Sequence, residues 1–365
     1  MSVNANVVVL PQQKAPLRIE TIRLPDPGQH QVLVKLFASG VCHSQLHQMH
    51  RDREHPVVLG HEATGVVMET GKDVTHVQEG DHVFVTWVPR DIHASGRLPI
   101  IATLETSEGL AMAENVYTWA DHTVADEQYV VKVDKNVRTD VTAIIGCAVM
   151  TGAGAVLNTA DVKKGESVAI FGAGGVGLSA VVAARMRGAD PIIVVDLDDT
   201  KLEFAKRFGA THGINASRED AVAAIHALTA KEKIYTIFQQ PVTGADYTFD
   251  CIGLKKTMEQ VVPACRGGHF GAAIGGTAVL VGVPMTPMEL QALDLLLHEK
   301  RFVGSIGGSC VPDRDFPTFV DWFEKGELDL DALVTERYKL EDINEATDAL
   351  EAGRISGRAI LDYRS

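Results

Sequence analysis

The sequence has few cysteines, no excess of basic residues and no long apolar run. Its 365 residues include five cysteines, and this odd number does not fit the disulfide framework of a small secreted protein. Acidic side chains outnumber basic ones by 48 to 34, and no cluster of Lys and Arg stands out, which excludes a broad nucleic-acid surface. No stretch approaches the roughly 20 apolar residues that cross a bilayer. We therefore expect a soluble cytoplasmic protein without a membrane or nucleic-acid partner.

What the sequence does contain predicts two domains. Hydrophobic residues make up 45% of the chain, enough to bury more than one core. Short β-branched runs separated by Pro, Gly and Asp dominate the N-terminal part and predict a mostly antiparallel β domain. Over residues 152–306 apolar strands alternate with helical stretches, which is typical of a parallel sheet with helices on both faces. The pattern then predicts helices over residues 315–325 and 340–352 and a last strand over residues 359–363.

A glycine-rich motif lies between a predicted buried strand, residues 167–171, and a predicted helix, residues 178–187. It reads Gly172-Ala173-Gly174-Gly175-Val176-Gly177, which is GxGxxG. Gly172 permits a tight turn, Gly174 lets the backbone approach a pyrophosphate, and Gly177 lets the helix pack closely on the strand. The first N–H groups of the helix then face the phosphates. The motif predicts a dinucleotide site, and a glycine-rich turn without a ligand is the alternative.

The next predicted strand, residues 192–195, ends in a carboxylate at Asp196. This residue lies about 20 positions beyond the glycines, where the dinucleotide fingerprint has its acidic residue. A carboxylate there accepts hydrogen bonds from the ribose hydroxyls and repels a 2′-phosphate, so the sequence favours NAD over NADP. Lys201 is in reach of the same ribose, and a solvated lysine at the start of a helix is an equal alternative for it.

Cysteine and histidine side chains recur next to glycines in the β-rich domain. Cys42 follows Gly40-Val41, His61 lies within Gly60-His61-Glu62, and Cys147 follows Gly146. Thiolate and imidazole are ligands that suit Zn²⁺, and three protein ligands with an open fourth position make a catalytic site. Taken one by one, these residues have an ordinary interpretation, because lone cysteines and histidines are commonly buried or satisfied groups.

Taken together, the motifs resemble the medium-chain, zinc-dependent alcohol dehydrogenase family over nearly the whole chain. Besides the nucleotide motif, the matching segments are residues 60–65 (GHEATG) with Gly71 and Val74, 244–253 (GADYTFDCIG), 280–284 (LVGVP) and 357–361 (GRAIL). The resemblance implies an α/β fold. A GroES-like, mostly antiparallel β catalytic domain would span residues 1–151 and 307–365, and a doubly wound Rossmann domain would span residues 152–306.

The resemblance also implies a catalytic zinc ion and a proton relay. The three residues that match its zinc ligands are Cys42, His61 and Cys147. Glu62 matches a carboxylate behind the metal. Ser44 matches the hydroxyl that takes the proton of the alcohol, and His47 matches the outer end of the relay. Because Ser44 and His47 are three residues apart, they share a face of a helix that begins after Cys42.

Other matches concern the cofactor and the substrate. His43 and Arg358 match basic residues that contact the pyrophosphate, and Val283 lies in a segment that matches a cofactor contact. Trp87 and Trp119 fall where the family places bulky walls of the substrate pocket. Burial in the core is an equal interpretation for both tryptophans, because large aromatic residues are often buried.

The sequence departs from the family at two places. Many relatives carry an acidic residue where this chain has Gln45, whose carbonyl can still accept the ring N–H of His61 but brings no charge. Relatives with a second, structural zinc carry four closely spaced cysteines in a lobe between the second and third catalytic ligands. This chain has none between Cys42 and Cys147. We therefore predict one zinc per subunit, and a long loop without metal within residues 89–117.

These features predict a reversible hydride transfer between a primary or secondary alcohol and NAD⁺, giving an aldehyde or a ketone. The resemblance further implies a homodimer or homotetramer, with residues 279–283 and 301–305 as candidate contacts between subunits. Two alternatives stay open: a zinc-free enoyl or quinone reductase of the same fold, and a nucleotide-binding protein without turnover.

Overall fold

The computed structural model describes residues 3–13, 15–91, 96–230, 234–236, 238–269 and 274–364. The chain divides into two compact units, and each is described here by itself. Unit 1 comprises Met1–Ala148 and Val311–Ser365, and unit 2 comprises Val149–Cys310. The domain limits expected from the sequence, after residues 151 and 306, lie close to these boundaries.

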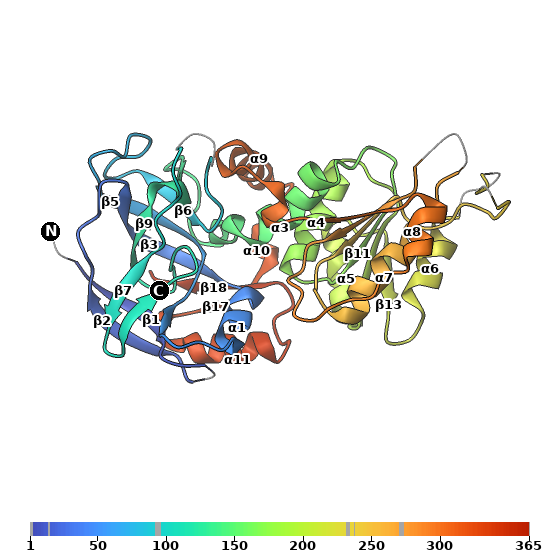
Figure 1. The fold of residues 1–365 in the computed structure, drawn as a ribbon. Coiled ribbons are helices and arrows are strands. Elements are labelled where there is room, and N and C mark those ends of the chain that lie inside the picture. The colour runs from blue at the N-terminus through green and yellow to red at the C-terminus, as the bar shows by residue number, and fades with distance from the viewer. Residues whose placement is uncertain are drawn as a thin grey trace. The chain divides into compact units, whose positions relative to one another are not determined.

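Unit 1 is a β structure with a few short helices (Figure 1). Its strands are β1 (Asn4–Leu10), β2 (Arg18–Arg23), β3 (Gln31–Val41), β4 (Val57–Val58), β5 (Glu62–Thr70), β6 (His82–Thr86), β7 (Thr103–Thr106), β8 (Gly109–Met112), β9 (His122–Asp126), β10 (Val130–Val133), β17 (Val334–Tyr338) and β18 (Arg358–Asp362). They form one sheet in the order β2-β1-β4-β8-β7 and another in the order β10-β6-β5-β3-β18-β17, with β9 paired to β3. Most of these pairings are antiparallel, which confirms the predicted class of this domain.

The helices of unit 1 are α1 (His43–His50), α9 (Pro312–Glu324), α10 (Leu330–Leu333) and α11 (Ile343–Glu351), with 3₁₀ turns η1 (Glu127–Tyr129), η2 (Val141–Gly146) and η5 (Leu340–Asp342). Helix α11 buries one apolar face, including Ile343 and Leu350, in a core that also contains Leu46 of α1 and Trp119. This core fixes α1 at one end of the seven-stranded sheet. The segment over residues 89–117, expected to contain a long loop, also contains the hairpin of β7 and β8.

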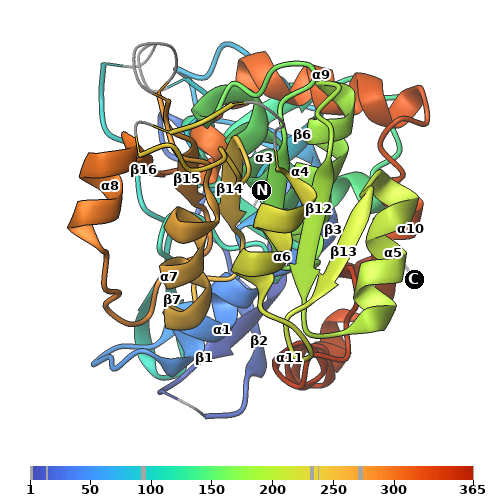
Figure 2. The same cartoon turned by 90° about the vertical axis from the view of Figure 1, so that its right-hand side faces the viewer.

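Unit 2 is a parallel sheet covered by helices (Figure 2). Its strands are β11 (Val168–Phe171), β12 (Ile192–Asp196), β13 (His212–Asn215), β14 (Tyr247–Asp250), β15 (Thr277–Leu280) and β16 (Arg301–Gly304), in the order β13-β12-β11-β14-β15-β16. Strand β11 is buried throughout, as expected for a sheet covered on both faces. The chain runs outward from β11 in one direction and then returns to start β14 on its other side. The carboxyl ends of β11 and β14 therefore form the switch point where ligands bind in such sheets.

The helices that cover this sheet are α4 (Gly175–Met186), α5 (Asp199–Phe208), α6 (Ala221–Leu228), α7 (Lys255–Ala264) and α8 (Ala292–His298). Helix α3 (Ala148–Gly154) begins at the boundary between the units, and the π-helical turn η3 (Ala155–Thr159) and the 3₁₀ turn η4 (Gly307–Ser309) also belong to unit 2. Helix α4 packs beside α5, and α6 packs beside α7. Within the described part of the chain, no helix is long and apolar enough to cross a membrane.

Candidate metal and cofactor sites

Strand register brings the predicted zinc ligands to one end of the seven-stranded sheet. Strands β3 and β5 pair antiparallel with Ser39 opposite Ala63, so the end of β3 lies beside the start of β5. Cys42 follows β3 directly, and His61 precedes β5 directly. Cys147 follows η2, whose last carbonyl accepts a hydrogen bond from the β6 residue Thr86 at 2.7 Å. Three segments distant in sequence therefore converge on one point.

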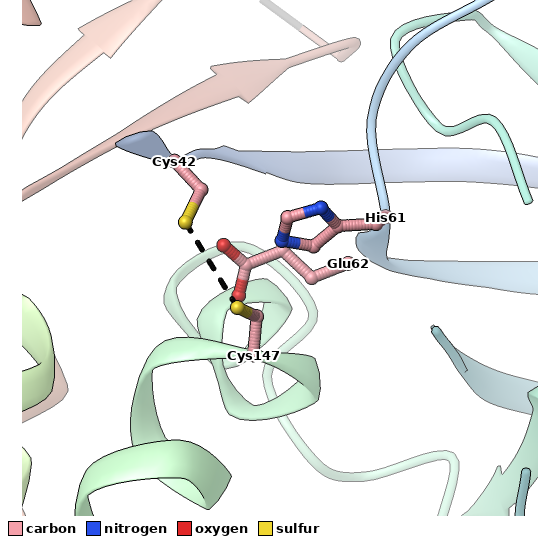
Figure 3. A group of neighbouring side chains, drawn as sticks. All are labelled: Cys42, His61, Glu62 and Cys147. Carbon is pink, nitrogen blue, oxygen red and sulfur yellow. Dashed lines mark hydrogen bonds between the residues drawn. The ribbon is translucent and has the colours of Figure 1, made fainter. Parts of the chain in front are cut away.

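The ligand cluster, defined as Cys42, His61, Glu62 and Cys147, is buried, and its side chains point toward one another (Figure 3). One ligand atom from each residue lies within 4.8 Å of all the others. The two sulfur atoms are 3.9 Å apart. This is far beyond the roughly 2.05 Å of a disulfide. It matches the roughly 3.8 Å that separates two sulfurs bound to one tetrahedral zinc at about 2.3 Å each.

Besides the distance between the two sulfurs, the environment of His61 tests whether zinc fits the ligand cluster. Its Nε2 is buried and has no hydrogen-bond partner in the described structure. A buried polar atom without a partner is unfavourable and is expected to bind something when the site is filled. Two cysteine sulfurs and one imidazole nitrogen are the donor set of a catalytic zinc. The residues present therefore fit this metal, with Cys42, Cys147 and His61 as the atoms that would hold it.

The two thiols of the cluster do not ionise alike. The hydrogen bond with Cys147 holds the pKa of the Cys42 thiol well below its usual value, with help from the nearby positive charge of Arg358. The pKa of Cys147 is raised by the same hydrogen bond and by burial. Of the two thiols, Cys42 therefore loses its proton more readily and forms the thiolate, the form that binds metal.

Glu62 belongs to the ligand cluster and is fully buried. Its carboxylate pairs with the Arg358 guanidinium, and its Oε2 accepts a long hydrogen bond of 3.4 Å from the Ala148 backbone. Burial raises the pKa of Glu62, and the charge of Arg358 opposes that rise. Space around the carboxylate is tight, because a Cβ added to Gly40 would lie 2.2 Å from Glu62 Oε1. The structure thus gives Glu62 a partner that the sequence did not predict.

Arg358 was expected to contact a pyrophosphate, and in the structure its guanidinium is held by Glu62. The pairing of β18 with β3 places Ala359 opposite Val41, so the side chain at 358 lies beside the end of β3. Arg358 is 5% exposed, and its Nε has no hydrogen-bond partner among the described residues. Its contact with the cofactor stays a prediction.

The predicted relay residues lie on α1, which begins directly after Cys42. Ser44 is half-buried, and its Oγ is 3.6 Å from Cys42 Sγ. His47 is one turn further along, also half-buried, with a buried Nδ1 that has no hydrogen-bond partner in the described structure. Burial lowers the pKa of His47, so its ring is neutral and able to accept a proton at neutral pH. His43, the first residue of α1, is exposed.

The two tryptophans predicted to wall a substrate pocket have different surroundings. Trp87 is half-buried, and its ring centroid lies 6.3 Å from that of His61. Trp119 is 0% exposed, packs in the core beneath α11, and donates its indole N–H to the Gly40 carbonyl at 3.0 Å. Trp119 is therefore a core residue, and its placement in the pocket is corrected. Only Trp87 stays a candidate pocket wall.

The environment of Gln45 also differs from expectation. The sequence suggested that its carbonyl accepts the ring N–H of His61. In the structure Gln45 Oε1 accepts the Cys42 backbone N–H at 3.1 Å, and the amide nitrogen faces His61 Nδ1. The side chain therefore closes a capping box at the start of α1.

The glycine-rich loop of unit 2 has the geometry that its motif predicts. Gly172 has φ +101°, which side chains rarely adopt. A Cβ on Gly177 would lie 1.8 Å from the Gly172 carbonyl oxygen, so only glycine lets α4 approach β11 this closely. Gly174 is the N-cap of α4, and a Cβ there would meet nothing within 4 Å. Gly175 and Val176 open the helix, so an anion can reach its first N–H groups.

Asp196 ends β12 beside this loop. Its Oδ2 accepts the Ala173 backbone N–H at 2.8 Å, so the carboxylate already orders the glycine-rich turn. Lys201 is half-buried in the first turn of α5. Val283 follows β15 and is 40% exposed, with its carbonyl against Gly253. These residues lie at the carboxyl edge of one sheet, where the fold places dinucleotides.

Two family models match this chain. The alcohol dehydrogenase GroES-like domain matches residues 28–135, and the zinc-binding dehydrogenase matches residues 175–325. An alcohol dehydrogenase class-3 of Cereibacter sphaeroides is 34% identical, over 93% of this chain and 94% of that protein. The chain belongs to the zinc-dependent alcohol dehydrogenase family. Members of this family are oxidoreductases that use zinc and a nicotinamide dinucleotide.

Solved structures of the alcohol dehydrogenase family share the fold over its full length. An alcohol dehydrogenase zinc-binding domain protein from Burkholderia ambifaria has a TM-score of 0.87 at 31% identity, covering 99% of both chains. The benzyl alcohol dehydrogenase of Acinetobacter calcoaceticus has a TM-score of 0.84 at 29% identity, again over 99% of both chains. These matches confirm the combination of a GroES-like domain with a Rossmann domain.

Sequence reasoning missed the partnership of Glu62 with Arg358. The two residues are 296 positions apart, and only the register of β18 against β3 brings them together. Local sequence offered one signal, since Arg358 is the first residue of a strand whose next three residues are apolar and buried. A charged residue there needs a buried partner of opposite charge.

Proposed function

We propose that this protein catalyses reversible hydride transfer between a primary or secondary alcohol and NAD⁺, with one zinc ion per subunit. The observation that carries the proposal is the ligand cluster. Its two sulfurs lie 3.9 Å apart, and the Nε2 of His61 is buried and unpartnered in the described structure. A protein that only bound a nucleotide would have no use for such a set, and a zinc-free reductase would not need it.

The residues around the cluster support a proton path out of the site. When bound, zinc would supply a Lewis acid toward the alcohol oxygen and NAD⁺ the hydride acceptor. The Ser44 hydroxyl, 3.6 Å from Cys42 Sγ, would accept the proton that the alcohol loses. His47, neutral because burial lowers its pKa, would receive that proton and release it to solvent.

The proposal of NAD over NADP rests on Asp196. Its carboxylate lies at the end of β12 and is tied to the glycine-rich loop by the Ala173 backbone. Asp198 and Asp199 follow directly and add negative charge. A 2′-phosphate would meet this charge without an arginine to balance it at these positions, so NADP should bind more weakly.

For the substrate we favour primary alcohols, aliphatic or aromatic, and the matching aldehydes. The ring of Trp87 near His61 would make the pocket narrow on that side. The named relatives agree in class, since one is a class-3 alcohol dehydrogenase and another a benzyl alcohol dehydrogenase. Sequence identities of 34% and 29% support alcohols as the class of substrate and do not single out one alcohol.

We further propose that two copies of the chain pair through β16. This strand lies at the edge of the sheet of unit 2 and has one side without a strand partner in the described structure. Such an edge is a template for another strand. Leu293 and Leu296 of α8, 64% and 74% exposed, lie shortly before this edge in sequence. Strand β15 lies between two others, so of the two expected contacts only residues 301–305 stay available. Light scattering of the purified chain tests whether it forms a dimer or a larger oligomer, and a monomer contradicts the proposal.

The decisive experiment combines an NADH-formation screen with zinc quantitation. Primary, secondary, aromatic and polyol alcohols are offered to the wild type and to Cys42→Ser. The wild type should hold about one zinc per chain and oxidise at least one alcohol class. Cys42→Ser should lose both zinc and turnover while NAD still binds. Full activity in that variant, or zinc near zero in the wild type, contradicts the proposal, and two zinc ions per chain contradict the predicted stoichiometry.

The alternatives give different outcomes in the same experiment. A zinc-free enoyl or quinone reductase would reduce its substrate with NAD(P)H and hold no zinc. A nucleotide-binding protein without turnover would bind NAD and oxidise none of the alcohols. The relay is tested separately by His47→Gln, which should slow alcohol oxidation chiefly near neutral pH. An unchanged pH profile in that variant argues against the role of His47.

A further inference from the structure

Gln45 lies between the backbone of one zinc ligand and the ring of another. It is the third residue of α1 and is 1% exposed. Its Oε1 accepts the Cys42 backbone N–H at 3.1 Å, and its Nε2 forms a short hydrogen bond with Nδ1 of His61. The two partners therefore lie at opposite ends of one side-chain amide.

One fixed donor sets the direction of this amide. A backbone N–H can only donate, so the Gln45 atom that faces Cys42 N must be the carbonyl oxygen. The amide nitrogen, which has no acceptor capacity, then faces His61 and donates to Nδ1. A neutral imidazole whose Nδ1 accepts a hydrogen bond carries its own proton on Nε2.

This tautomer conflicts with zinc ligation. Nδ1 is engaged by Gln45, so Nε2 is the nitrogen left for a metal, and it is buried without a hydrogen-bond partner in the described structure. A ligating nitrogen must carry no proton. To bind zinc, His61 must hold its proton on Nδ1 and needs an acceptor beside that atom.

We infer that Gln45 is a positioning residue whose amide takes two orientations, one in the metal-free chain and the other in the zinc-loaded chain. In the metal-free orientation, which the structure shows, Oε1 caps α1 through the Cys42 N–H. In the zinc-loaded orientation Oε1 would accept the proton on His61 Nδ1, and the Cys42 N–H would lose its acceptor. The inference rests on the proposed zinc site.

This conflict between the tautomer of His61 and zinc ligation should lower the zinc affinity of the wild-type protein. Zinc entry requires the amide to turn and leaves one buried N–H without its partner, which opposes binding. A carboxylate at this position would remove the conflict, because both of its oxygens accept hydrogen bonds. Gln45→Glu should therefore raise the zinc affinity by about 10-fold, the lower end of the usual effect of residues that orient metal ligands. Gln48→Glu is the matched control, since it adds the same charge to the same helix.

The tautomer of His61 is tested without any turnover. The full-length protein is labelled with ¹⁵N-histidine, and its ring nitrogens are measured at about pH 8, where histidine is ordinarily neutral. The His61 signals are assigned by their loss in His61→Gln. Metal-free wild type should show a proton on Nε2, and zinc-loaded wild type should show it on Nδ1. A proton on Nδ1 in both states overturns the inference.

The second arm measures zinc affinity by chelator competition. We expect a higher zinc affinity for Gln45→Glu than for wild type, and the same zinc affinity for Gln48→Glu and wild type. Equal zinc affinity for Gln45→Glu and wild type, or an equal gain in zinc affinity for Gln48→Glu, overturns the inference.

Failure of the proposed function can be distinguished from failure of this inference, because a wild type that binds no zinc still has a tautomer of His61 that can be measured in the metal-free chain. In that case metal-free Gln45→Glu should hold the His61 proton on Nδ1, and a proton still on Nε2 overturns the inference.

Discussion

Unit 1 contains two groups of charged side chains with buried carboxylates, and the two groups differ in how their polar atoms are satisfied. One is the ligand cluster with its neighbour Arg358. The other, which we name the Arg97 cluster, consists of Arg97, Asp126 and Glu127. In the Arg97 cluster the buried Asp126 carboxylate accepts two guanidinium hydrogen bonds, at 2.7 and 3.1 Å, and two backbone N–H bonds, both at 2.9 Å. In the ligand cluster an imidazole nitrogen is left without a partner among the described residues.

The comparison shows that burial of charge does not by itself mark a functional site. The Arg97 cluster ties the chain before β7 to the end of β9. Arg97 pairs with both of its acids, and Glu127 also contacts the rings of His30 and His76. In the ligand cluster Glu62 pairs with Arg358, and the two cysteines and the imidazole of His61 form a group that could hold a metal ion.

The largest expected effect is on the pair of Glu62 and Arg358. Arg358→Leu should leave a buried carboxylate unpaired and lower the free energy of unfolding of the metal-free chain by about 3–5 kcal/mol. Urea unfolding measures the change. The double variant Glu62→Gln/Arg358→Leu should recover much of the loss, because it buries no uncompensated charge. A single variant as stable as wild type would show that another group balances Glu62.

Zinc should stabilise one cluster and leave the other unaffected. At a free zinc concentration of about 100 times Kd, the free energy of unfolding should rise by about 2.7 kcal/mol. Arg97→Met should show the same rise as wild type, and His61→Ala should show almost none. These values come from urea unfolding with and without zinc. A rise that disappears in Arg97→Met would mean that the two clusters are coupled.

Removing the cation of the Arg97 cluster should cost somewhat less than removing Arg358. Arg97→Met should lower the free energy of unfolding by about 2 kcal/mol, since solvent screens a pair whose arginine side chain is 24% exposed. Zinc content and alcohol oxidation, measured in the same preparation, should stay at wild-type values. A loss of zinc in this variant would contradict the purely structural role of the cluster.

The smallest effect concerns a third group of charges, around Asp140, whose carboxylate pairs with Arg138 and Arg337. Burial alone would raise the pKa of Asp140, but hydrogen bonds from Arg138 and Arg337 outweigh it and hold that pKa well below its usual range. The stabilisation is therefore present above the unfolded pKa of about 3.9 and is lost as the pH falls toward the lowered folded value.

Asp140→Asn tests this dependence. Between about pH 5 and pH 2 the wild type should lose about 1 kcal/mol more stability than the variant, because both arginines are well exposed. Unfolding curves at several pH values measure the difference, and it should be the same with and without zinc. Parallel pH profiles for the two proteins would show that the ion pairs contribute nothing.

Much of the fold could be predicted from local sequence because it depends on local patterns. The alternation of strands and helices predicted the parallel sheet of unit 2. The glycines predicted the turn at Gly172 and the close approach at Gly177, because backbone geometry there admits no side chain. Strands in the N-terminal part followed from β-branched runs. The hairpin of β7 and β8 was missed, since its residues lack a strong period-two pattern.

The sequence predicted which residues make up the candidate site, but not which contacts those residues make. Residue type and resemblance selected Cys42, His61 and Cys147, since thiolate and imidazole chemistry is a property of the side chain alone. Resemblance also placed Trp119 in a pocket, where the structure buries it in a core beneath α11. Whether a large aromatic residue lines a pocket or fills a core depends on what packs against it, and residues distant in sequence decide that.

The sequence by itself thus determined the two kinds of domain, the dinucleotide loop and the set of residues able to hold zinc. Only the tertiary structure decided that Arg358 pairs with Glu62, that Asp126 is neutralised by Arg97, and that the amide of Gln45 faces His61 with its nitrogen. The physical reason is the same in each case. A hydrogen bond or an ion pair joins two atoms in space, and strand register, which no local pattern records, sets which atoms meet.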